Sequence, residues 1–344
     1  MRILIVKRDK LGDMLLTIPL IQHLKRSLAG SEIHVLASDY GGWVLGECPE
    51  VSRVWTYPRL RASALLKPAS LLRYLRTHRA VRRERFDVVI AAGGEFSRRA
   101  IEKALAVKGA RTIAYVPDAR SFAGRLSDPL PAPMGGHEID RMLGLASPLG
   151  LALPKEPASP EFVPPKRACE FARAWLAERG LQERGYVVLG LGARRAARQP
   201  DQAQILRWSA YWRDRHGLAT VFMWTPGGAG NSQYPGDDSI AQTVLDAARG
   251  QRPDIHAFRG PVVEALGLIW LARTSVFPDS GLMHFAAASP GGVLGLFAGP
   301  DLGPAPDQWA PRGRNAAWLR AAAQIPDLPD AEFLAAIDRL LERV

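Results

Sequence analysis

Cysteine is scarce in this sequence, which has two among its 344 residues. Cys48 and Cys169 lie far apart in the chain and in different predicted domains, so they offer no disulfide framework and favour a reducing compartment. We therefore expect a cytoplasmic protein.

Long apolar runs are missing as well. The longest, such as 187–191 and 293–297, fall well short of the roughly 18 residues that a membrane-spanning helix needs. The first apolar run, 3–6, is closed by Lys7 and Arg8 and is too short for a signal peptide. The sequence thus predicts neither a transmembrane helix nor a secretion signal.

Several motifs that would define an activity are absent. No Gly-x-Gly-x-x-Gly pattern follows the first predicted strand, which excludes a dinucleotide site there, and neither a P-loop nor a Gly-x-Ser-x-Gly elbow occurs. Cysteine and histidine do not cluster with metal-ligand spacing. The adjacent acids Asp237 and Asp238 can bind magnesium or simply belong to a turn, and we predict no metal and no cofactor.

The sequence does contain enough apolar side chain for packed cores. Hydrophobic residues make up 47% and charged residues 23%, as in ordinary soluble globular proteins. A chain of 344 residues exceeds the size at which a single core stops growing, roughly 250 to 300 residues. We therefore expect two domains.

Short β-branched runs alternate with amphipathic helical stretches up to about Ala298, which predicts an α/β fold with one doubly wound, Rossmann-like parallel sheet in each half. The predicted strands are 2–6, 32–37, 51–57, 87–92 and 111–116, then 186–191, 219–224, 255–259, 275–278 and 293–297. Because such sheets bind ligands at the carboxyl ends of their strands, we expect two ligands to meet in a cleft between the domains.

A proline-rich segment separates the two halves. Residues 154–165 contain five prolines and cannot sustain a helix or an interior strand. We predict domains over 1–153 and 167–344, joined by a linker over 154–166. Apolar residues at helical spacing predict a last helix over 330–343 that packs on one of the domains.

The formal net charge of +11 calls for an anionic partner. Much of this charge lies in one stretch, where nine basic residues accompany a single acid, Glu84. The nine are Arg59, Arg61, Lys67, Arg73, Arg76, Arg79, Arg82, Arg83 and Arg85. The stretch is either a solvated helix surface or a contact for phosphates. Few aromatic residues lie among them and no nucleic-acid motif occurs, so we predict no nucleic-acid partner.

Two segments carry candidate chemistry. Asp13 follows Gly12 just after the first strand, where it either caps a helix start or takes a proton from an attacking hydroxyl. In the second half, small polar residues at 279–281 follow a strand and open a helix, whose first-turn N–H groups favour phosphate. Gly281 permits a close backbone approach, and His284 can donate to a pyrophosphate.

Two further loops follow strands of the second half. The loop after 186–191 contains glycines and three arginines that can surround a diphosphate. The loop after 219–224 places Trp224 near Asn231, where the two can frame a base and a ribose.

The segments 2–7, Gly12-Asp13 with Pro19, and 279–284 with Ala286 to Ala288 together resemble glycosyltransferase family 9, the ADP-heptose:lipopolysaccharide heptosyltransferases. The resemblance runs over most of the chain. It implies a GT-B fold, with the acceptor bound by 1–153 and the nucleotide sugar by 167–344. It also implies inverting, metal-independent transfer of heptose to the lipid A-linked inner core at the cytoplasmic face of the inner membrane. We expect a monomer in peripheral contact with that anionic surface.

By position, Asp13 resembles the family's general base. The residues that we predict to bind the donor are Asp279, Ser280, Gly281, Leu282, Met283, His284, Gly192, Arg194, Arg195, Arg198, Trp224 and Asn231. The residues that we predict to bind the acceptor are Lys7, Arg59, Arg61 and Arg120.

The sequence departs from the family in one loop. Relatives usually carry Lys-Arg-Trp-Pro where this chain has Ala197-Arg198-Gln199-Pro200. Arg194, Arg195 or Arg198 can supply the missing charge, and Asn231 or Asp238 can replace the glutamate that usually binds the ribose. Another nucleotide sugar, a protein acceptor, or a nucleotide-sugar epimerase of the same architecture remain alternatives.

Overall fold

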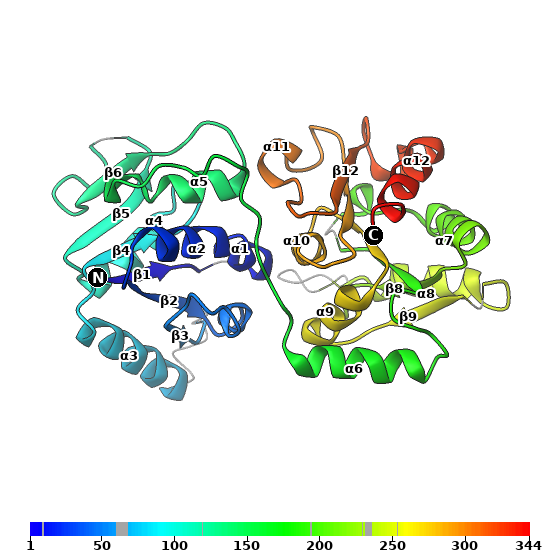
Figure 1. Cartoon of the computed structure of the whole chain (residues 1–344), viewed down its shortest axis with the longest axis horizontal. Helices are drawn as coiled ribbons and strands as arrows, with labels where there is room; N and C mark the ends of the chain where they lie inside the picture. The colour runs from blue at the N-terminus through cyan, green and yellow to red at the C-terminus, as the bar shows by residue number, and fades with distance from the viewer. Residues whose placement is uncertain are drawn as a thin grey trace. The chain divides into compact units, whose positions relative to one another are not determined.

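The computed structural model describes residues 1–8, 10–59, 68–118, 120–192, 195–228, 230, 236–252 and 254–344. The chain folds into two compact units, Met1–Glu161 and Phe162–Val344, here called the N-terminal and C-terminal units (Figure 1). Cys48 and Cys169 are free thiols. No helix among the described residues is long and apolar enough to cross a membrane.

The N-terminal unit contains a six-stranded parallel sheet in the order β3-β2-β1-β4-β5-β6. Its strands are β1 (Arg2–Val6), β2 (Glu32–Ser38), β3 (Arg53–Tyr57), β4 (Val88–Ala91), β5 (Arg111–Val116) and β6 (Asp128–Pro131). Five of them match predicted strands. The sixth, β6, was not predicted because its sequence is Asp-Pro-Leu-Pro, and proline is tolerated only where a strand lies at the edge of a sheet.

Helices flank this sheet, and residues from both elements form its core. They are α1 (Leu11–Leu15), α2 (Ile18–Ser27), α3 (Pro68–Arg83), α4 (Arg98–Val107) and α5 (Glu138–Gly144). On one face, apolar side chains of β1 and β4 pack with Ile101 and Val107 of α4, and Val81 of α3 joins the same cluster. This packing fixes the strand ends from which the loops of the unit emerge.

The C-terminal unit contains a second six-stranded parallel sheet in the order β12-β11-β10-β7-β8-β9. Its strands are β7 (Tyr186–Gly190), β8 (Ala219–Met223), β9 (Ile255–Phe258), β10 (Thr274–Pro278), β11 (Val293–Phe297) and β12 (Ala316–Arg320). Read from β9, the order is the same as in the first sheet, and it is the Rossmann order. The edge strand β12 was not predicted because its sequence, Ala-Ala-Trp-Leu-Arg, contains no β-branched residue.

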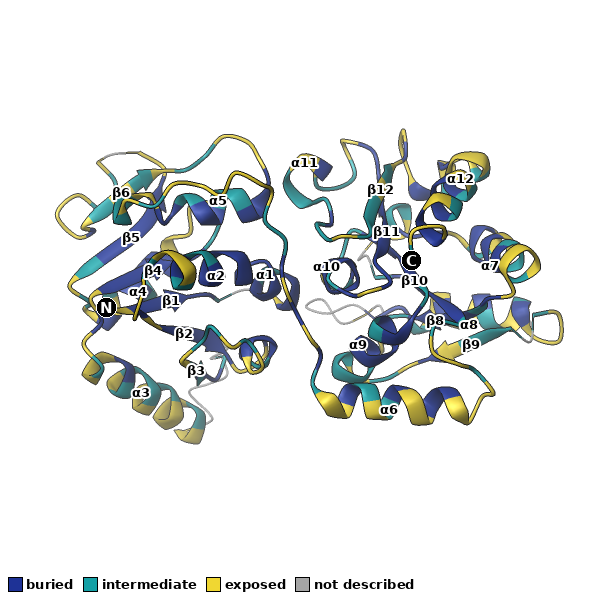
Figure 2. Cartoon of the chain, viewed as in Figure 1, coloured by how far each residue is buried: buried dark blue, intermediate teal, exposed yellow. Residues whose placement is uncertain are grey.

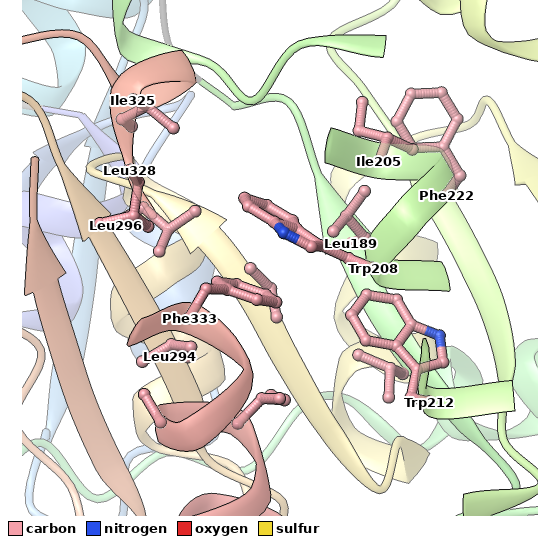
Figure 3. Packing of buried hydrophobic residues seen from close by; sticks show 14 of the residues in the cluster. Leu189, Ile205, Trp208, Trp212, Phe222, Leu294, Leu296, Ile325, Leu328 and Phe333 are labelled. Atoms are coloured by element: carbon pink, nitrogen blue, oxygen red, sulfur yellow. The ribbon is translucent and has the colours of Figure 1, made fainter. Parts of the chain in front are cut away.

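The helices of the second unit are α6 (Lys166–Ala177), α7 (Gln202–His216), α8 (Asp238–Ala248), α9 (Val262–Leu271), α10 (Gly281–Ala287), α11 (Pro306–Trp309) and α12 (Asp330–Leu341). The predicted last helix corresponds to α12, and it packs on this unit. The rings of Phe333 in α12 and Trp208 in α7 stack with their centroids 3.7 Å apart (Figure 3). Trp208 Nε1 also donates to Asp330 Oδ1 over 2.9 Å, which fixes the start of the helix.

Both sheets reverse their strand order next to their first strand. β1 lies between β2 and β4, and β7 lies between β8 and β10. Loops that leave two such neighbouring strands turn to opposite faces of the sheet, which leaves room for a ligand between them. The loops after β1 and β4, and those after β7 and β10, are therefore the candidate ligand loops of the two sheets.

Candidate active site

The loops after β7 and β10 meet at the carboxyl edge of the second sheet. Gly192 has a φ of +48°, and a Cβ at this position would lie 2.9 Å from Ser280 Oγ. Both the left-handed backbone and the close approach favour glycine. Ser280 Oγ is buried, and no described residue forms a hydrogen bond with it. The structure thus brings together two of the loops that we predicted to bind the donor, with a hydroxyl at the point of contact.

Arg198 joins three loops of this edge. It ends a short 3-10 helix, Ala196–Arg198, and its guanidinium pairs with the carboxylate of Asp279, which follows β10. A Cβ at Gly303, after β11, would lie 3.3 Å from Arg198 Nε. The two side chains are only 19% and 13% exposed, so the pair is well shielded from water. Since the charge of Arg198 is already balanced by Asp279, we interpret this arginine as positioning the loops. Arg195, exposed on the same loop, is better placed to contribute net charge.

The segment 279–284 divides between surface and interior. Ser280 is the N-cap of α10 and has an extended backbone, but its side chain does not cap the helix. Gly281 is exposed, and Leu282 is half-buried. Met283 is fully buried, and a Cβ at Gly295 would lie 2.9 Å from its Sδ, so its side chain belongs to the core and does not face a ligand.

His284 is also buried, with its ring centroid 6.4 Å from that of Trp309 in α11. We expected His284, one turn into the helix, to donate to the pyrophosphate. Its burial beside Trp309 leaves little of the imidazole exposed to a ligand.

The loop after β8 is held by the carboxylate of Asp238, both oxygens of which accept hydrogen bonds. Asp238 Oδ1 accepts from Trp224 Nε1 over 2.8 Å, and Arg259 donates to both oxygens over 2.9 Å each. The Gly227 N–H donates to Oδ2 over 2.9 Å. Hydrogen bonds from Arg259 and Trp224 hold the pKa of Asp238 well below its usual range. Trp224 is therefore fixed at the loop by Asp238, an arrangement that suits a rigid wall for a base.

The neighbouring carboxylate, Asp237, is buried and has a different hydrogen-bond partner. Gln199 Nε2 donates to Asp237 Oδ1 over 2.9 Å, and both residues are buried. Burial raises the pKa of Asp237, although the bond from Gln199 opposes the shift. This contact ties the loop after β7 to the start of α8, and nothing in the local sequence had pointed to it. Within the described ranges, no group of three or more acids, histidines or cysteines is arranged to hold a metal ion.

In the N-terminal unit, Asp13 is the third residue of α1. Its Oδ2 accepts from the Lys10 N–H over 3.1 Å, so the capping interaction that we considered does occur. Thr17 Oγ1 donates to the Asp13 carbonyl over 2.9 Å and steadies the same turn. A carboxylate offers about four acceptor sites on its two oxygens, so accepting the Lys10 N–H does not by itself prevent Asp13 from taking a proton. Capping and proton acceptance are therefore compatible.

Lys7, which we predicted to bind the acceptor, has little exposed surface. It is buried at the end of β1, and its Nζ lies 3.7 Å from Met142 Sδ in α5. Near it, Glu138 Oε1 accepts from the Gly94 N–H, after β4, over 2.8 Å. A Cβ at Gly94 would overlap this carboxylate, so a larger residue there would have to displace the Glu138 side chain. Sequence reasoning missed Glu138, although the Gly93-Gly94 pair after a central strand was an available signal.

The remaining predicted acceptor residues are spread along the edge. Arg59 follows β3, and its guanidinium lies 4.3 Å from the centre of the Tyr40 ring. Arg120 follows β5, is exposed, and donates its backbone N–H to Asp118 Oδ1 over 2.9 Å. Because β3 and β5 lie on opposite sides of β1 and β4, these arginines flank the edge instead of forming one cluster. Arg61, Arg194 and Asn231 lie outside the described residues.

Two Rossmann-like units with ligand loops at their carboxyl edges are the components of a GT-B glycosyltransferase. The model of glycosyltransferase family 9 (heptosyltransferase) matches residues 74–332, and the chain belongs to this family. The family resemblance and the α/β GT-B fold that we predicted are thus confirmed.

Relatives and solved structures agree with this assignment. Lipopolysaccharide heptosyltransferase 3 of Escherichia coli is 25% identical over 348 residues, which cover 96% of each chain. The structure of E. coli ADP-heptose lps heptosyltransferase II superposes with a TM-score of 0.75 at 20% identity, covering 100% of this chain and 99% of that one. E. coli heptosyltransferase WaaC, solved with ADP, also gives a TM-score of 0.75 at 17% identity, covering 99% and 100%.

Proposed function

We propose that this protein transfers heptose from ADP-heptose to the inner core of lipopolysaccharide, with inversion at the anomeric carbon and without a required metal. The acceptor is a lipid A-linked oligosaccharide, and the enzyme works as a monomer at the cytoplasmic face of the inner membrane. Membership of the heptosyltransferase family supports the class of reaction. ADP as the nucleotide is supported by solved neighbours that are described with ADP and with ADP-2-deoxy-2-fluoro heptose.

The observation that carries the proposal is the meeting of Gly192 and Ser280 where the second sheet reverses its strand order. A diphosphate placed there accepts a hydrogen bond from the Ser280 hydroxyl and is attracted by the positive charge of Arg195. The ion pair of Arg198 and Asp279 keeps the loops in position. Trp224, held by Asp238, offers a face for the base. Hydrogen-bond donors and positive charges that are already in position around the leaving diphosphate stabilise the negative charge that develops on it.

In the reaction, the acceptor hydroxyl oxygen forms a bond to the anomeric carbon as the bond from that carbon to the phosphate oxygen breaks. ADP departs, and the hydroxyl proton passes to the carboxylate of Asp13. Attack on the face opposite the leaving group inverts the configuration. Proton transfer to a positioned base is worth about 10² to 10⁴ in rate.

The proposal is tested by incubating the purified protein with ADP-heptose and deacylated inner-core oligosaccharide in the presence of EDTA. We expect a mass increase of one heptose on the acceptor, and NMR of the product reports the anomeric configuration. Absence of transfer with every core fraction contradicts the acceptor, and transfer that depends on added magnesium contradicts the metal-independent mechanism.

A different nucleotide sugar is the second candidate. It is favoured by Gln199, which stands in the segment where relatives usually carry Lys-Arg-Trp-Pro and which binds Asp237. Competition of ADP-heptose binding by ADP, UDP and GDP distinguishes the donors. A nucleotide-sugar epimerase is disfavoured by the family match, and its signature would be sugar isomerisation without an acceptor.

A further inference from the structure

Helix α3 carries the basic stretch of the sequence, and one side of it is anchored to the N-terminal unit. Tyr74, Thr77, His78 and Val81 recur at the spacing of one helical face. Thr77 Oγ1 donates to the Thr56 carbonyl of β3 over 3.0 Å, and Val81 is buried.

The same side is fastened to α4. Lys103 Nζ donates to the Tyr74 hydroxyl over 3.0 Å and lies 3.8 Å from the centre of the Tyr57 ring. The Tyr74 and His78 rings lie 4.4 Å apart. The orientation of α3 about its own axis is therefore fixed, and the opposite side is turned to solvent (Figure 2).

That solvent-facing side combines leucine with arginine. Leu71, Leu72 and Leu75 are 38%, 46% and 41% exposed, and Leu75 is a neighbour of both others on the helix surface, at i,i+4 from Leu71 and i,i+3 from Leu72. A single exposed leucine needs no explanation, but a cluster marks a binding surface. The helix holds no acidic residue and contains Arg73, Arg76, Arg79, Arg82 and Arg83.

The leucines lie at the end of α3 that is closest to the carboxyl edge of the first sheet. Tyr74, Thr77 and His78 contact Thr56 and Tyr57, the last two residues of β3. Residues 71 and 72 therefore lie level with the carboxyl end of this strand or beyond it. Arg73 agrees with this position, since its Nη1 is 4.0 Å from the carboxylate of Asp39, which follows β2.

We propose that the outer face of α3, defined by Leu71, Leu72 and Leu75 with Arg76 and Arg79, docks on an anionic phospholipid bilayer. The leucines enter the headgroup region and the arginines bind lipid phosphates, as in helices that lie in a membrane interface. A nucleic acid offers the arginines the same phosphates but nothing for three adjacent leucines. Docking there brings the carboxyl edge of the first sheet to the lipid surface. The benefit to a lipid-anchored acceptor rests on the proposed function, whereas the docking does not.

The experiment uses the full chain and vesicles of phosphatidylglycerol with phosphatidylethanolamine, compared with pure phosphatidylcholine, in co-sedimentation at two salt concentrations. The wild type should bind the anionic vesicles and not the neutral ones. Leu72→Ser combined with Leu75→Ser should weaken binding at least tenfold. Arg76→Gln combined with Arg79→Gln should weaken it and also reduce its salt dependence.

Matched controls use residues outside α3. Leu153→Ser, at a side chain that is 55% exposed, and Arg249→Gln, at an arginine in the C-terminal unit, should bind as the wild type does. All of these side chains are exposed, so thermal unfolding should stay unchanged. Equal binding by the leucine variant and the wild type overturns the proposal, as does equal binding to neutral vesicles or binding to no vesicle at all.

Transfer assays separate this inference from the proposed function. The leucine variant should transfer heptose to a deacylated, soluble acceptor at the wild-type rate and lose about tenfold on an acceptor embedded in anionic vesicles. Equal rates on the embedded acceptor contradict a role in acceptor access. If the wild type transfers to neither acceptor yet still binds the vesicles, the proposed function fails and the docking surface stands.

Discussion

The loops of the second sheet and helix α3 beside the first sheet differ in how their charged side chains are balanced, although the two sheets share one strand order. In the C-terminal unit, Asp279 pairs with Arg198 and Asp238 with Arg259, so arginine and acid neutralise each other within the loops. In the N-terminal unit, helix α3 carries five arginines and no acid, and the nearby Lys103, whose pKa burial and the charge of Arg8 lower to about 8, belongs to the same basic region.

Two sheets with the same strand order therefore support two different arrangements of charge. Balanced pairs hold loops rigid for a ligand that needs a defined geometry, whereas excess positive charge draws a large anion to a surface. A nucleotide sugar fits the first description, and an anionic saccharide on a membrane fits the second.

The largest effect is expected at Asp13. Asp13→Asn keeps an oxygen that can accept from the Lys10 N–H, but it removes the proton acceptor. Turnover should fall about 10² to 10⁴ fold while ADP affinity stays unchanged, measured by product formation and by calorimetric titration. Asp201→Asn is the matched control, because Asp201 caps α7 through a 2.7 Å bond from the Gln204 N–H and should tolerate the change. Full activity in Asp13→Asn would remove Asp13 from the mechanism.

The next effect concerns the pair of Arg198 and Asp279. Arg198→Met leaves a shielded carboxylate without its cation, which should cost about 2 kcal/mol of unfolding free energy and weaken ADP binding about 10 to 100 fold. Arg207→Met is the control, because its pair with Asp330 is about half exposed and should matter little. Urea unfolding and ADP titration measure the two quantities. Unchanged ADP affinity would show that this pair does not position the donor loops.

Sequence patterns located the central strands because strands buried on both faces read as continuous apolar runs, as in β7. They missed β6 and β12, whose edge positions permit proline and half-exposed residues. Loops after the central strands were equally predictable, since topology alone assigns ligands to them.

The contacts inside those loops were not predictable. Arg198 and Asp279 are 81 residues apart, and no local pattern says that they pair. Met283 and Lys7 were expected at a ligand because neighbours in sequence lie there, but helix and strand geometry turns both side chains inward. Such outcomes depend on tertiary packing, which a single sequence does not report.

A smaller effect separates backbone strain from close contact in the C-terminal unit. Gly192 and Gly217 have φ values of +48° and +66°, but a Cβ meets Ser280 Oγ at the first position and nothing within 4 Å at the second. Replacing either by alanine should cost about 1 kcal/mol of stability, because both backbones are left-handed. Only Gly192→Ala should also weaken ADP binding, by about tenfold. Equal ADP affinities in the two variants would place the diphosphate away from this contact.

The smallest effect tests the unbalanced charge of the N-terminal unit. Burial, with a contribution from Lys103, lowers the pKa of His78 from 6.5 to about 4, so the folded state favours the neutral ring. The stabilisation is complete above pH 6.5 and is lost as the pH falls towards 4. Solvent screening should limit it to about 1 kcal/mol. We expect His78→Gln to lose less stability than the wild type between pH 7 and pH 4.5 in urea unfolding, and Lys103→Met to raise the His78 pKa measured by NMR. A His78 pKa near 6.5 in the folded wild type would show that this cluster is open to water and that α3 is less firmly anchored than its contacts indicate.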